Sequence, residues 1–166
     1  MSTRILVSAL VFAGLSSAAI AVVHGASSTP NDWLLNEPDA DKRAELVQDQ
    51  FGGFSAAMWE VGERWSAIHA ALERSNLDLA QYHWDKLDDA IASGVVRRPG
   101  RKPSAEEHFP ESFAREVGED FASGDVERAW RGFEKGRNAC MACHVAEGMP
   151  FLNDQAMFDQ RTPGAE

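Results

Sequence analysis

The stretch Cys140-Met141-Ala142-Cys143-His144 places two cysteines three positions apart, with a histidine directly after the second. On a helix the two thiols lie on one turn, and Cys140 and His144 form an i, i+4 pair on one face. Two thiols at this spacing can each add to a vinyl group at the same porphyrin edge, while the imidazole coordinates the iron from one side. The spacing is that of a C-x-x-C-H attachment site and predicts one covalently held haem c per chain.

The chain contains only two cysteines, and both lie in this motif. A structural zinc site usually takes four Cys or His ligands from two separated pairs, and the sequence has no second pair. A thioredoxin-like C-x-x-C sits at the start of a helix after a strand, whereas no β-α-β pattern surrounds this one. A disulfide between the two neighbouring cysteines remains as the alternative to haem attachment.

The first 25 residues have the pattern of a secretory signal peptide. Arg4 supplies the positive charge, residues 5–23 are apolar or small, and the groups before Ala26 are small enough for cleavage there. A retained membrane anchor is the alternative, but the strongly apolar part, residues 5–15, is short for a bilayer-spanning helix. We therefore expect a periplasmic protein without membrane contact after cleavage. Bacteria attach c-type haem outside the cytoplasm, which agrees with the motif.

The composition indicates one acidic domain. The 166 residues include 16 Lys and Arg and 26 Asp and Glu, for a formal net charge of −10. This balance argues against nucleic acid and anionic membrane surfaces, and it suits docking on a redox partner with a basic surface. Residues 26–38 contain serines and prolines and are expected to form an irregular arm. Residues 39–145 form the predicted haem domain, and residues 146–166 a C-terminal tail.

From Asp39 onward, apolar residues recur at helical spacing. The apolar seam consists of Val47, Phe51, Phe54, Met58, Val61, Trp65, Ile68 and Leu72. Alternating steps of four and three predict one unbroken amphipathic helix that continues to about Leu72. Gly52 and Gly53 lie off the seam and lower the helix propensity locally.

Three further helices are predicted. Asn76 caps the second, which ends at Gly94; the third covers residues 112–122. The fourth begins after Asp125, continues through the C-x-x-C-H motif and stops at Gly148, while the proline-rich, basic residues 95–110 form a loop. Four amphipathic helices with mostly short turns predict an all-α fold, an antiparallel four-helix bundle with haem c near the C-terminal end of the last helix.

Four helices with C-x-x-C-H in the last one resemble the class II c-type cytochromes, meaning cytochrome c′ and its low-spin relatives. The resemblance covers about residues 40–145. It implies that Cys140 and Cys143 hold the haem, that His144 is the proximal iron ligand, and that the distal residue comes from the first helix. Met58 matches the low-spin relatives, which have a methionine there, whereas cytochrome c′ has a non-ligating apolar side chain. The family also implies a homodimer formed through the first two helices.

The sequence leaves the sixth coordination position of the iron open. Met58 is the leading candidate, and an empty or apolar-blocked distal face is the main alternative. The remaining candidate ligands are His69, His83, His108, Met149 and Met157. Trp65 and Trp130 lie on inner stripes of the first and fourth helices and are predicted to form walls of the haem pocket.

The axial ligands of the haem iron decide which of three functions is expected. A haem bound by His144 and Met58 is six-coordinate, has a raised potential and carries single electrons. An open distal site would bind small gases such as nitric oxide, and a fixed haem subunit of a larger periplasmic redox complex is a third alternative. No nucleophile–base pair or carboxylate pair stands out, so we expect no enzyme acting on an organic substrate.

Overall fold

The computed structural model describes residue 29 and residues 31–160, and the chain divides into two compact units, 1–38 and 39–166. The elements are α1 (Ala40–Phe51), α2 (Phe54–Leu72), α3 (Leu77–Arg97), η1 (Pro99–Arg101), α4 (Lys102–His108), α5 (Glu111–Phe121), α6 (Val126–Ala146), η2 (Pro150–Asp154) and η3 (Ala156–Phe158), where η marks a 3-10 helix. Residues 31–160 contain no strand, which confirms the all-α class. The predicted signal peptide, residues 1–25, lies outside the described residues.

The described part of the first unit, residues 29 and 31–38, forms turns rather than a helix. Asn36 donates a hydrogen bond from its side-chain amide to the carbonyl oxygen of Thr29 at 2.8 Å, and its backbone N–H donates to the carbonyl of Asp32 at the same distance. Asp39 then caps α1 by accepting from the backbone N–H of Asp41 at 2.9 Å. The second unit therefore begins with a capped helix.

The prediction of one unbroken helix from Asp39 to Leu72 is wrong, because the helix is interrupted at Gly52 and Gly53. Gly52 has a φ of 66°, and a Cβ at this position would lie 2.8 Å from the Cβ of Ala56. Glycine adopts this backbone region without steric cost, so α1 ends here and α2 starts two residues later. None of the residues of α1 is buried, and Phe51 is 61% exposed. The N-terminal part of the apolar seam therefore contributes nothing to the core.

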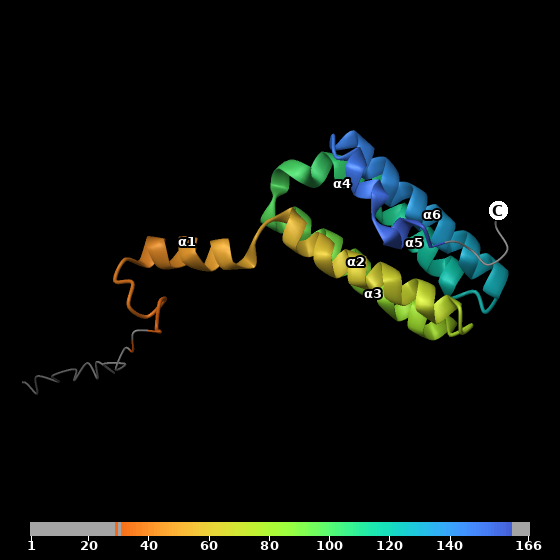
Figure 1. Cartoon of the computed structure of the whole chain (residues 1–166), viewed down its shortest axis with the longest axis horizontal. Helices are drawn as coiled ribbons and strands as arrows, with labels where there is room; N and C mark the ends of the chain where they lie inside the picture. Colours follow the sequence, from red (N-terminus) through yellow and green to blue (C-terminus); the bar gives the residue numbers. More distant parts are fainter. Residues whose placement is uncertain (1–28, 30, 161–166) are drawn as a thin grey trace, which may run out of the picture. The chain divides into compact units, whose positions relative to one another are not determined.

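Helices α2 and α3 form one hairpin, and α5 and α6 form another, each joined by a short turn (Figure 1). The side-chain oxygen of Asn76 accepts from the N–H of Leu79 at 3.1 Å and caps α3, as predicted. Asp125 caps α6 in the same way through the N–H of Arg128 at 2.9 Å. The two hairpins contact each other through α3 with α5 and through α2 with α6.

Gly94 does not end α3, contrary to the prediction. A Cβ on this buried residue would lie 3.0 Å from the Cβ of Ala57 and 3.1 Å from the ring of Phe54. The missing side chain therefore lets α2 approach α3 closely, and the helix continues to Arg97.

Residues 95–110 are not the loop that the sequence predicts. The end of α3, the short helix η1 and α4 occupy most of this stretch. Pro103 lies in the first turn of α4, where proline is tolerated because the N–H groups there have no partner within the helix. Ala105 is buried, so α4 packs against the domain, where it contacts α6.

Large aromatic side chains fill the core between the two hairpins. The rings of Trp65 and Phe133 stack with their centroids 4.2 Å apart, which joins α2 to α6. The indole N–H of Trp84 donates to the carbonyl of Ala114 at 2.8 Å and joins α3 to α5. Both tryptophans are 1% exposed. Buried aromatic pairs of this kind contribute about 0.5–1.5 kcal/mol beyond their buried area.

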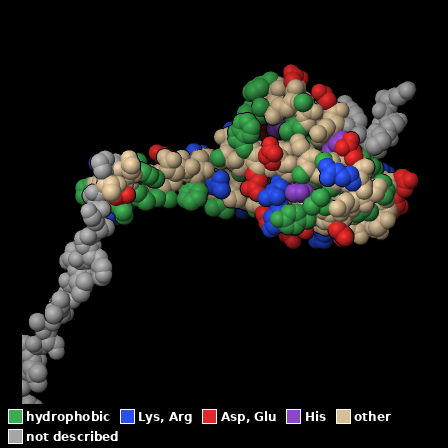
Figure 2. Space-filling model, turned by 60° about the horizontal axis from the view of Figure 1, so that its bottom comes forward, with side chains coloured by type: hydrophobic (Ala, Val, Ile, Leu, Met, Phe, Trp, Pro, Cys, Tyr) green, Lys and Arg blue, Asp and Glu red, His purple; other side chains and the backbone are tan. Residues whose placement is uncertain are grey.

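The surface of the helical unit carries both signs of charge. On the face shown in Figure 2, acidic and basic side chains are interspersed and do not gather in one patch. In the part of the chain that the structure describes, no helix is long and apolar enough to span a bilayer.

Candidate functional site

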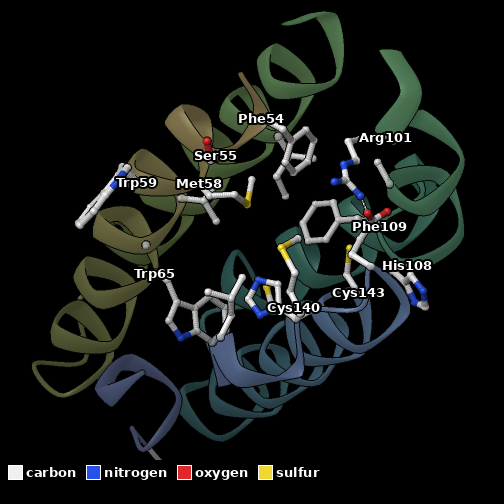
Figure 3. Close-up of a pocket in the computed structure, with 18 of the residues that line it drawn as sticks. Phe54, Ser55, Met58, Trp59, Trp65, Arg101, His108, Phe109, Cys140 and Cys143 are labelled. Atoms are coloured by element: carbon white, nitrogen blue, oxygen red, sulfur yellow. Dashed lines mark ion pairs between the residues drawn. The ribbon is translucent and has the colours of Figure 1, made fainter. Parts of the chain in front are cut away.

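A cavity of about 630 Å³ lies beside the C-x-x-C-H motif (Figure 3). Helices α2, α4 and α6 contribute to its wall, together with residues 150–158, which we call the C-terminal segment. Its volume falls within the range of about 300–1,000 Å³ that is typical of ligand and cofactor sites. Five of the six predicted site residues line it, namely Met58, Trp65, Cys140, Cys143 and His144.

The two thiols are free and half-buried. Burial, followed by the neighbouring Cys143, raises the pKa of Cys140 to about 12. Burial also raises the pKa of Cys143, although the charge of Arg101 acts in the opposite direction. Both groups are therefore neutral thiols at pH 7. Within the described residues, no three His, Cys, Asp or Glu side chains converge as ligands for a bare metal ion.

The imidazole of His144 is held by a residue that sequence reasoning missed. Its Nδ1 lies 2.9 Å from Oδ1 of Asn153 in the C-terminal segment. The amide Nδ2 of Asn153 donates to the carbonyl oxygen of Met141, one turn before His144, at 3.2 Å. A carbonyl oxygen only accepts hydrogen bonds, so this contact fixes which end of the amide faces His144. In the neutral imidazole, Nδ1 of His144 is then the donor and Nε2 carries the lone pair.

Phe158 also packs against the imidazole of His144. Its ring meets the imidazole of His144 edge-on, with the centroids 5.6 Å apart, and the side chain is 3% exposed. Its carbonyl oxygen accepts from Nε of the buried Arg137 at 2.9 Å, and the same guanidinium donates to Glu134 at 3.1 Å. The last part of the C-terminal segment is therefore tied to α6.

Met58 approaches the cavity from α2. Its side chain points inward from this helix, and the sulfur faces the space that Cys140 faces from α6 (Figure 3). Trp65, two turns further along α2, forms part of the same wall. Met58 also packs against the hydrophobic core, so its position agrees with either a ligand or a packing role.

Trp130 does not line the cavity, contrary to the prediction. It is buried in the core, where its ring packs edge-on against Phe133 with the centroids 5.6 Å apart. His69 packs against Trp130, and its ring centroid lies 5.3 Å away. The inner stripe of α6 extends beyond the cavity, so the part of the stripe that carries Trp130 packs against aromatic residues of the core.

The other candidate ligands differ in whether they line the cavity. His83 is absent from the cavity wall, and burial and the charge of Arg64 lower its pKa. His108, Met149 and Met157 do line the cavity. The Nε2 atom of His108 is buried and has no hydrogen-bond partner among the described residues.

Two arginines from the connection between α3 and α4 supply positive charge to the cavity wall. They are Arg98 and Arg101, and Arg101 forms an ion pair with Glu147 just after α6 (Figure 3). Lys135, although close to Cys140 in sequence, instead pairs with Asp120 at 2.8 Å and Glu116 at 2.6 Å on α5. The cations at the cavity therefore come from the stretch that was predicted to be a loop.

Comparison of the chain with protein-family models, with curated proteins and with solved structures gives no match. The resemblance to class II c-type cytochromes therefore stays a prediction from the C-x-x-C-H motif and the order of the helices.

Proposed function

We propose that this chain is a periplasmic c-type cytochrome that carries single electrons. In this proposal α2, α3, α5 and α6 form an antiparallel four-helix bundle around the cofactor. One observation carries it: the thiols of Cys140 and Cys143, the imidazole of His144 and the thioether of Met58 line the same cavity. These groups come from the two helices α2 and α6, which contact each other across the core.

The residues of the cavity fit a haem. Two free thiols one turn apart suit covalent attachment at one porphyrin edge, and the lone pair on Nε2 of His144 suits axial ligation. Met58 would supply the second axial ligand. Haem iron held in this way supplies one-electron chemistry, and thioether ligation raises its potential. The chain's own part is to hold the ring rigidly and to exclude water from its faces.

The carboxylates of a haem need cations, and the cavity supplies them. Arg98 and Arg101 would hold the propionates, because a guanidinium binds a carboxylate with two parallel hydrogen bonds. Arg101 would then exchange or share its present partner, Glu147. Lys135 is not assigned this role, because it does not line the cavity and pairs with Asp120 and Glu116 on α5.

Electron transfer also requires a partner protein. The net charge of −10 favours a partner with a basic docking surface, and association as a homodimer through the first two helices of the bundle, α2 and α3, is part of the same proposal. Neither affects how the haem would be held.

A visible spectrum in both oxidation states, recorded with and without nitric oxide, tests the proposed function. A six-coordinate electron carrier gives a low-spin spectrum that nitric oxide changes slowly or not at all. A high-spin spectrum that changes at once on addition of nitric oxide would instead assign the chain to gas binding. A protein purified without haem would contradict both.

A further inference from the structure

The C-terminal segment places one amide against the imidazole of the C-x-x-C-H motif. Asn153 lies on η2, which begins at Pro150, and its side chain is half-buried. It donates to the carbonyl of Met141 at 3.2 Å and accepts from Nδ1 of His144 at 2.9 Å. The two bonds use opposite ends of the amide, so Asn153 bridges the backbone and the side chain of one turn of α6.

We propose that Asn153 is a positioning residue that fixes the tautomer of His144 and lowers the reduction potential of the haem. The inference rests on the proposed function, since it requires His144 to bind the iron. An acceptor on Nδ1 holds the proton there, orients the ring and makes Nε2 a stronger electron donor. A stronger donor favours the ferric state, which carries one more positive charge than the ferrous state.

The surroundings of Asn153 keep it in place. The C-terminal segment is fastened further along at Phe158, whose ring contacts His144 and whose carbonyl is bound by Arg137 at 2.9 Å. Met149 lies directly before η2, and its N–H donates to the carbonyl of His144 at 2.8 Å. The chain is thus tied to α6 on both sides of Asn153, and the amide between these ties has little freedom to move.

Two substitutions change the strength of the hydrogen-bond acceptor at position 153 in opposite directions. Asn153→Leu keeps a similar size and removes the acceptor, so the potential should rise. Asn153→Asp replaces the amide oxygen with a carboxylate, a stronger acceptor, so the potential should fall. We expect each change to shift the redox equilibrium by up to about tenfold, which is about 59 mV for a one-electron couple. Asp154→Asn, an exposed neighbour on the same 3-10 helix, is the matched control and should leave the potential unchanged.

The measurement is the reduction potential of the haem-loaded full chain by spectroelectrochemistry, after haem content has been checked for every variant. Shifts of opposite sign for the Leu and Asp variants support the proposal. Equal potentials, or shifts of the same sign, would overturn it, because a purely structural loss does not depend on the charge of the acceptor.

A second measurement does not depend on haem. In the haem-free chain, the ¹⁵N chemical shifts of His144 should report a proton on Nδ1 in the wild type and a mixture of tautomers in Asn153→Leu. A mixture in the wild type would overturn the positioning role. If the wild-type chain takes up no haem, the proposed function fails, and this measurement still decides the contact between Asn153 and His144.

Discussion

Met58 on α2 and Cys140 on α6 direct their sulfur atoms into one cavity, although they come from opposite ends of the helical domain's sequence (Figure 3). The contact between α2 and α6 produces this relationship, with Trp65 stacked on Phe133 beside the cavity. A thioether and a thiol that face the same space suit a ring held between them. The proposed electron-carrier function requires Met58 as a ligand, whereas the proposed haem attachment does not.

Replacing Met58 separates an electron carrier from a gas binder. Met58→Leu keeps the apolar volume and removes the sulfur lone pair, so the weak far-red absorption of an iron–sulfur bond should disappear. The reduction potential should fall, because thioether ligation raises it, and carbon monoxide should bind the ferrous protein readily. Spectra of the oxidised and the reduced carbon monoxide forms are the measurement.

Two other methionines of the cavity wall serve as controls. Met149→Leu and Met157→Leu remove the same kind of sulfur from the same cavity and should leave the far-red band in place. If the band survives Met58→Leu and is lost in one of these variants, the ligand comes from the C-terminal end of the chain and not from α2.

Asp120 should make the domain sensitive to strong acid. Its side chain is 6% exposed and accepts from Arg128 and Lys135, each at 2.8 Å. Burial alone would raise its pKa, but the hydrogen bonds and charges of the two cations outweigh burial and hold the pKa below its usual value. The ionised carboxylate therefore stabilises the fold fully above its unfolded pKa of about 3.8, and this stability is lost as pH falls through the lower folded pKa.

Asp120→Asn should lower the free energy of unfolding at pH 7 by about 1–3 kcal/mol. Solvent screening limits the effect, because both cations are partly exposed. The variant should also lose less stability than the wild type between pH 4 and pH 2. Denaturant titrations followed by circular dichroism at several pH values are the measurement. Glu116→Gln is the control, because its carboxylate shares Lys135 but is 58% exposed, and it should change stability much less. Parallel pH curves for the wild type and Asp120→Asn would contradict the assignment.

Gly136 is required where α6 crosses the aromatic core. A Cβ there would lie 3.0 Å from the ring of Trp65 and 3.2 Å from that of Trp84. Moving either ring would cost packing or hydrogen-bond energy, because Trp65 stacks on Phe133 and the indole of Trp84 is hydrogen-bonded. Gly136→Ala should therefore destabilise the chain by about 1–2 kcal/mol after the gain in helix propensity, as measured by thermal unfolding. Gly100→Ala is the control, since a Cβ there meets nothing within 4 Å, and a stability equal to wild type in both variants would show that the core repacks freely.

Periodicity predicted three of the four helices because their caps and apolar stripes agree. Asn76 and Asp125 start α3 and α6, and the third helix is displaced from its predicted range by one residue at each end. The first helix was predicted too long because a heptad pattern records spacing and not backbone conformation. Only the positive φ of Gly52 shows that Phe51 belongs to a separate helix.

The site was predicted unevenly for a similar reason. Cys140 and His144 were predicted from a local motif, and Met58 from its place on a stripe together with the resemblance to class II c-type cytochromes; all three line the cavity. Asn153 was missed because a single polar residue in a short 3-10 helix has neither a motif nor a period. Trp130 was placed at the cavity because its stripe also contains the motif, but the stripe extends beyond the cavity into the aromatic core. Arg98 and Arg101 reach the cavity only because residues 95–110 fold back as helices.

Covalent haem attachment is the central claim, and one measurement tests it most directly. The full-length chain is produced in a bacterium that exports it and attaches c-type haem, and the purified protein is denatured, extracted with acidic organic solvent and weighed by mass spectrometry. The account predicts the mass of the chain beginning near Ala26 plus one haem, and loss of the haem in the double variant Cys140→Ala, Cys143→Ala. Ala142→Ser, an exposed position between the two cysteines, should retain the haem. A wild-type chain that is exported intact but carries no haem after extraction would contradict the account.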